Sequence, residues 1–113
     1  MAKIQMQGTG SAFSIAEMLT NEILNNGLSC ELIEEFKQNI NDVEVIVLVF
    51  EKYYWRSSNR ASLTLTIIGN GEIVTVSAIG SGGGQGVFFK MSWGAEDDFV
   101  SIVEHALKEN GFR

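Results

Sequence analysis

Alternation of polar and apolar residues in the middle of the chain constrains the fold most strongly. From Val43 onward the sequence has a period of two, rich in β-branched and aromatic side chains and interrupted by turn signals, which is typical of β-strands. Asn70-Gly71 is the strongest turn signal and predicts a two-residue type I′ hairpin, so neighbouring strands should form an antiparallel meander. The predicted strands are Val43 to Tyr54, Ser62 to Ile68, Glu72 to Ile79 and Val87 to Met91.

Two segments near the ends have the 3.6-residue period of amphipathic helices. The first follows a short strand around Ile4 and Met6. Its predicted start is the capping-box pattern of Ser14 and Glu17, and Asn26-Gly27 is its predicted stop. The second ends before Gly111. The expected buried residues are Ala12, Ile15, Ala16, Leu19 and Ile23 in the first helix, and Phe99, Ile102, Val103 and Ala106 in the second.

The segment from residue 28 to residue 40 fits two structures. Leu28, Leu32, Ile33, Phe36 and Ile40 have helical spacing, whereas Leu28, Cys30, Leu32 and Phe36 suit a strand. Periodicity does not decide between these alternatives. We favour a strand, because Asn41-Asp42 can form a tight turn into the strand that begins at Val43.

The 113 residues have the size of one domain, residues 1–113. Helices from the two ends can cover one face of the sheet. We therefore predict an α+β two-layer sandwich, in which an antiparallel meander sheet of about five or six strands carries an N-terminal and a C-terminal helix on one face.

The strand sequence VEVIVLVF is apolar on both of its faces. We expect Val45, Val47 and Val49 to face the helices. The opposite face should then carry Ile46, Leu48 and Phe50, beside Thr64, Thr66, Thr75 and Ser77 of the neighbouring strands. Because exposed apolar surface of this kind usually marks a contact, the sequence predicts a homodimer, or a small ligand held on the helix-free face.

Composition and charge argue against several functions. With 14 acidic and 8 basic residues the net charge is −6, which disfavours nucleic acid as a partner. One cysteine, Cys30, cannot form an internal disulfide and fits a reducing compartment. The longest apolar run, Val45 to Phe50, is too short to span a membrane, and the N-terminus lacks a signal-peptide core. We expect a cytoplasmic protein without membrane or nucleic-acid partners.

No catalytic, metal or cofactor site is predicted. The glycine-rich stretch GSGGGQG, residues 80–86, matches the dinucleotide fingerprint in neither register and lacks the Lys-Ser/Thr of a phosphate-binding loop. His105 has no second histidine to help it bind a metal. Cys30 is interpreted as a small, half-buried core residue.

The stretch EKYYWRSSNR, residues 51–60, interleaves aromatic and basic side chains. A meander places this stretch and the glycine-rich stretch at the same end of the sheet. Any ligand that binds there should therefore be small and anionic or aromatic. Alternatively, Tyr53 and Trp55 continue the buried face of their strand while the basic residues fringe the other. The candidate ligand-binding residues are Lys52, Tyr54, Arg56, Arg60, Gly83, Gly84 and Gln85.

Four motifs resemble those of a family of small bacterial proteins, mainly from Gram-positive anaerobes, that carry a domain of unknown function. The motifs are EKYYWR, RASL, GGGQG and WGAE. The resemblance implies a free-standing cytoplasmic domain in which EKYYWR and GSGGGQG belong to one site, and it implies no catalytic residue.

Our leading hypothesis from the sequence is a non-enzymatic binding or interaction protein. The alternative is an enzyme that acts on a small anionic or aromatic substrate. In that case Lys52, Tyr54, Arg56 and Arg60 would bind the substrate and Glu51 would act as a base.

Overall fold

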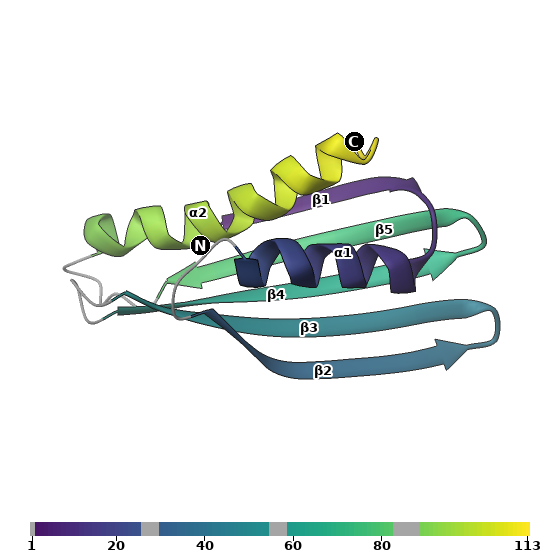
Figure 1. The fold of residues 1–113 in the computed structure, drawn as a ribbon, viewed down its shortest axis with the longest axis horizontal. Helices are drawn as coiled ribbons and strands as arrows, with labels where there is room; N and C mark the ends of the chain where they lie inside the picture. The colour runs from purple at the N-terminus through teal and green to yellow at the C-terminus, as the bar shows by residue number, and fades with distance from the viewer. Residues whose placement is uncertain (1, 26–29, 55–58, 83–88) are drawn as a thin grey trace.

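The computed structural model describes residues 2–25, 30–54, 59–82 and 89–113. Within these ranges the chain forms one five-stranded antiparallel sheet in the order β1-β5-β4-β3-β2 and two helices (Figure 1). The predicted α+β class is confirmed, with five strands. The elements are β1 (Ala2–Thr9), α1 (Ala12–Asn25), β2 (Cys30–Ile40), β3 (Val43–Tyr54), β4 (Asn59–Asn70), β5 (Ile73–Gly82) and α2 (Phe89–Glu109).

The ambiguous segment forms β2, as favoured from the sequence. Ile40 pairs with Val43 across a two-residue turn, and Asn41 occupies this turn with a φ of 57°. Asparagine tolerates this left-handed conformation better than most residues. The strand also contains a β-bulge between Leu32 and Glu34, so Ile33 has no partner on β3.

Two details predicted for the later strands are wrong. Asn70 itself pairs with Ile73, so the hairpin turn consists of Gly71 and Glu72, and only Gly71 has a positive φ, of 65°. A positive φ at the first position alone is typical of a type II′ turn rather than a type I′ turn. The strand predicted at 87–91 is also wrong in its described residues, because Phe89 to Met91 begin α2. A run of five residues, four of them apolar, fits either period.

The start of α1 differs from the prediction by one turn. The N–H of Ser14 donates to Ser11 Oγ at 3.1 Å, so Ser11 rather than Ser14 is the N-cap. The cap lies early because Ala12 already packs on the sheet: a Cβ atom at Gly69 would be 2.9 Å from the Ala12 Cβ. The predicted buried stripe of α1 is confirmed.

The face of β3 that meets the helices is the reverse of the predicted one. Ile46, Leu48 and Phe50 are at most 4% exposed and share the core with both helices, whereas Val45, Val47 and Val49 lie half-buried on the opposite face. Where both faces of a strand are apolar, the period alone does not determine which face packs against the helices. Here the larger side chains fill the space beneath the helices. The core of the sheet also includes Leu63, Leu65, Ile67, Val74, Val76 and Ala78.

The two edges of the sheet differ. At the β1 edge, Gln7 and Arg113 exchange two backbone hydrogen bonds, of 2.8 and 3.0 Å, and the ring of Phe112 lies against Gly8. At the other edge, β2 ends the strand order, and α1 and α2 lie mainly over the other strands (Figure 1). Every residue from Ile33 to Ile40 is exposed.

Candidate functional site

The helix-free face of the sheet is the largest candidate interaction surface. Side chains on this face that are 36–53% exposed include Phe36, Ile40, Ile68, Ile73 and Ile79. The half-buried valines of β3 lie between them. Polar residues gather on the β1 side, where Lys3, Gln5 and Gln7 are exposed. The face therefore carries exposed apolar side chains on β2, β4 and β5 and has a polar margin along β1.

At one end of this face Arg60 forms an ion pair with Glu51. Arg60 Nη1 lies 3.4 Å from Glu51 Oε1, and the two side chains are 69% and 40% exposed. A shallow hollow of about 200 Å³ lies beside the pair and is also lined by Ser62, Ser81 and Gly82. Because the carboxylate balances the guanidinium, the hollow has no strong preference for an anion.

Two of the predicted ligand-binding residues, Lys52 and Arg60, line a small hollow of about 90 Å³ together with Glu31, Glu51 and Tyr53, although they lie on different faces of the sheet. Arg60 lies on the helix-free face, whereas Lys52 lies on the helix side, with its Nζ 5.9 Å from the centre of the Phe99 ring. Tyr54 belongs to β3 and pairs with Asn59. The remaining predicted residues, Arg56, Gly83, Gly84 and Gln85, lie outside the described residues.

The beginning of the glycine-rich stretch lies at the same end of the sheet as Arg60. Ala61 pairs with Gly82 and Leu63 pairs with Gly80. This confirms the predicted neighbourhood for Gly80, Ser81 and Gly82. The alternative placement of Tyr53 on the buried face is wrong. Tyr53 pairs with Arg60 and lies four residues after Val49, so it is on the same helix-free face of β3. The reversed face of β3 explains this difference.

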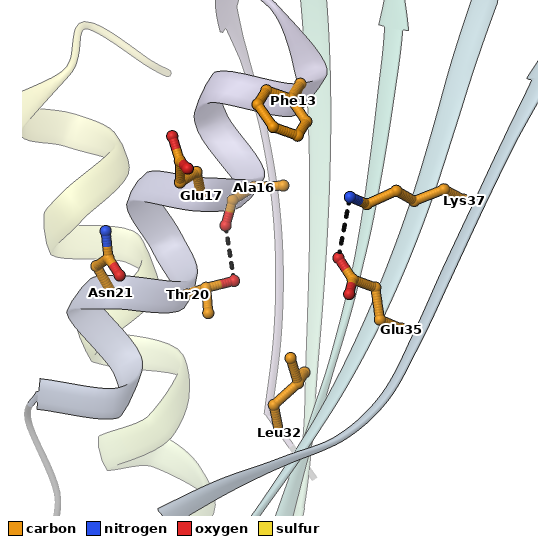
Figure 2. Close-up of a pocket in the computed structure, with 8 residues that line it drawn as sticks. All are labelled: Phe13, Ala16, Glu17, Thr20, Asn21, Leu32, Glu35 and Lys37. Atoms are coloured by element: carbon orange, nitrogen blue, oxygen red, sulfur yellow. Dashed lines mark hydrogen bonds and ion pairs between the residues drawn. The ribbon is translucent and has the colours of Figure 1, made fainter.

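A cleft between α1 and β2 was not predicted from the sequence. It has a volume of about 260 Å³, and Figure 2 shows Glu17, Thr20 and Asn21 of α1 on one side and Leu32, Glu35 and Lys37 of β2 on the other. Lys37 Nζ lies 3.2 Å from Glu35 Oε2 and 5.1 Å from the centre of the Phe13 ring. The cleft forms because β2 extends beyond the helices, and no sequence pattern indicates that.

The candidate reactive groups have ordinary structural partners. His105 is exposed and lies 3.4 Å from Glu109 one helical turn away. Cys30 is half-buried against the core, and burial raises the pKa of its thiol. Among the described residues, no group of three or more acidic, histidine or cysteine side chains could hold a metal ion. In the same part of the chain no helix is long and apolar enough to cross a membrane.

The fold and this site define a small α+β protein in which one sheet face is exposed among the described residues. The chain belongs to DUF6054, a family of unknown function whose model matches residues 1–111. Among solved structures it is similar to the protein TTHA0849 from Thermus thermophilus, with 11% identity, 96% of this chain and 95% of that chain covered, and a TM-score of 0.36. No curated protein matches the sequence.

Proposed function

We propose that the protein is a non-enzymatic interaction protein that associates with a second copy of itself through the helix-free face. The exposed apolar residues of this face, chiefly Phe36, Ile40 and Ile68, carry the proposal. A sheet face that is exposed to water normally carries polar side chains. Contiguous apolar surface of this kind is typical of protein contacts. A bacterial origin and a cytoplasmic location are part of the same proposal.

The size of the face supports a stable contact between copies. The strands have 8 to 12 residues. At about 3.3 Å per residue and about 4.8 Å between strands, the face measures on the order of 800 Å². Stable interfaces bury about 800 Å² on each partner. The valines, threonines and serines at its centre are short, so two such faces can approach to the spacing of about 10 Å found in β-sandwiches.

The alternative function, an enzyme at the EKYYWR end, has less support. Arg60 is paired with Glu51, and Lys52 lies on the other face of the sheet. The hollow that both cations line has a volume of only about 90 Å³ and is also lined by the carboxylates of Glu31 and Glu51, which disfavour an anionic substrate. A small anionic or aromatic ligand remains an outcome that a thermal-shift screen would detect as a raised melting temperature.

The test compares two equally exposed aliphatic side chains on different elements. Ile68 on the helix-free face and Leu24 on α1 are both 38% exposed. Light scattering should give the wild type at least twice the 12.4 kDa mass of one chain. Ile68→Lys should halve the particle mass, and Leu24→Lys should leave it unchanged. A monomeric wild type, or a mass that Ile68→Lys does not alter, would contradict the proposal.

A further inference from the structure

The outer edge of β2 is open along a strand of 11 residues. Unpaired edges of this length are templates for a further strand, and proteins often close them. At the β1 edge the backbone of Arg113 pairs with Gln7. In the described part of the chain no corresponding segment lies beyond β2. The bulge after Leu32 leaves the stretch from Glu34 to Ile40 regular, in unbroken register with β3.

The turn at Asn41 determines which backbone groups of β2 point outward. In a two-residue hairpin the closing pair, here Ile40 and Val43, is hydrogen-bonded, and such pairs alternate along the ladder. The N–H and C=O groups of Glu35, Lys37 and Asn39 must therefore point away from β3. The N–H of Glu35 fits this assignment, because it donates to Glu34 Oε1 at 3.0 Å instead of to β3.

We propose that β2 of two copies pair edge to edge, antiparallel, around a two-fold axis at Phe36, so that two sheets become one of ten strands. Charge selects this register. With the axis at Phe36, Glu35 lies opposite the partner's Lys37, and the pair occurs twice. An axis at Glu35 or Lys37 would place like charges opposite each other, which destabilises a sheet. An axis at Gln38 would give no opposite-charge pair.

The distribution of side chains on the helix-free face agrees with this pairing. At the axis, Phe36 meets the Phe36 of the partner subunit in a non-hydrogen-bonded pair, where side chains approach most closely. Phe36 is 50% exposed in one chain. The pairing also places Phe36 and Ile40 of each chain near the middle of the joint sheet and leaves the polar β1 strands at its outer edges.

Cysteine crosslinking tests the register. Phe36→Cys in a Cys30→Ala background should form a disulfide-linked dimer on mild oxidation, because Cα atoms of a non-hydrogen-bonded pair lie about 4.5 Å apart, within disulfide range. Gln38→Cys, on the same face two residues along, should not. A dimer linked at residue 38 and not at residue 36 would overturn the register, and no crosslink at either position would overturn the edge pairing.

Charge reversal tests the basis of recognition. Glu35→Lys or Lys37→Glu alone places like charges across the axis twice, and should raise the dissociation constant about tenfold. The double variant restores opposite charges and should bind within about threefold of the wild type. Single reversals that leave the dissociation constant unchanged would overturn the proposed contact.

The edge contact and the face contact can fail independently. Stacked faces keep backbones about 10 Å apart, too far for the Phe36→Cys disulfide. The crosslink should therefore form equally well when Ile68→Lys has removed the face contact. Loss of the crosslink in that background would show that the β2 edges do not pair without the face contact, and would overturn the edge pairing as an independent contact.

Discussion

The ring of Phe112 lies so close to Gly8 that a Cβ atom at Gly8 would come within 2.5 Å of the Phe112 Cδ1. Phe112 is 3% exposed, and the next residue, Arg113, is hydrogen-bonded to Gln7. The ring therefore has little freedom to move aside. Glycine is required at this position of β1 by the close approach of the C-terminal segment.

We predict that Gly8→Ala lowers the free energy of unfolding by about 1–3 kcal/mol, the usual cost of overpacking a filled site. Urea denaturation would measure it. In a Phe112→Ala background the same substitution should cost little, because the space is then empty. An equal cost in both backgrounds would show that the ring is not the cause.

The N-cap of α1 gives a second prediction. Ser11→Ala should lower the free energy of unfolding by about 1 kcal/mol, because Ser11 Oγ accepts the N–H of Ser14. Ser14→Ala should cost less than about 0.5 kcal/mol, as for an exposed side chain without a capping role. The opposite order, measured by thermal or chemical denaturation, would place the cap at Ser14.

The turn between β2 and β3 should be sensitive at its first position. Asn41 has a φ of 57°, which most side chains adopt only at a cost of about 1–2 kcal/mol. Asn41→Val should lower the free energy of unfolding by about that amount, and Asn41→Gly should be close to neutral. Asp42→Val is the matched control and should cost less. Equal effects of valine at the two positions would contradict this conformation.

The reactivity of Cys30 should depend on two charged neighbours. Burial raises the pKa of the Cys30 thiol, Lys52 opposite it lowers the pKa, and Glu31 raises it. Lys52→Met should therefore raise the pKa further and slow alkylation by iodoacetamide at a fixed pH. Glu31→Gln should lower the pKa and speed alkylation. The pH dependence of the alkylation rate measures both shifts, and a change in the reverse direction for either variant would refute the assignment.

The same shift makes stability depend on pH. The thiol of the folded protein has the higher pKa, so the unfolded chain loses its proton first as the pH rises. The stability contributed by the protonated thiol is complete below the pKa of the unfolded chain and is lost as the pH rises through the folded pKa. Cys30→Ala should flatten this alkaline decline in denaturation experiments. If stability declines equally with pH in Cys30→Ala and in the wild type, the decline is caused by other groups.

Much of the fold was predictable because local patterns and tertiary structure agree. The buried stripe of α1 follows from its period alone. The strand β2 was favoured only through its neighbour, the Asn41-Asp42 turn, because its own apolar spacing fits two structures. The extent of α2 could not be predicted, since the run that begins it has the composition of a strand.

The candidate site was less predictable, because it depends on which face of the sheet the helices cover. In β3 both faces are apolar, so the period fixes the alternation but not its direction. The reversal moved Leu48 into the core, where it is 1% exposed, and left Val47 half-buried on the helix-free face. It also placed Lys52 on the helix side of the sheet instead of on the same face as Arg60. The undetermined orientation of β3 therefore affected the predictions for both the dimer surface and the ligand site.

The hydrogen bonds between Gln7 and Arg113 also bear on how the chain folds. The four strands from β2 to β5 each pair with a neighbour in sequence. In contrast, β1 pairs with β5, which is distant in the sequence, and Gln7 on its other edge pairs with Arg113. Bringing these distant segments together costs conformational entropy before their contacts can stabilise the structure. We therefore expect the β2 to β5 meander to form first, and the attachment of β1 and the C-terminal segment to limit the folding rate.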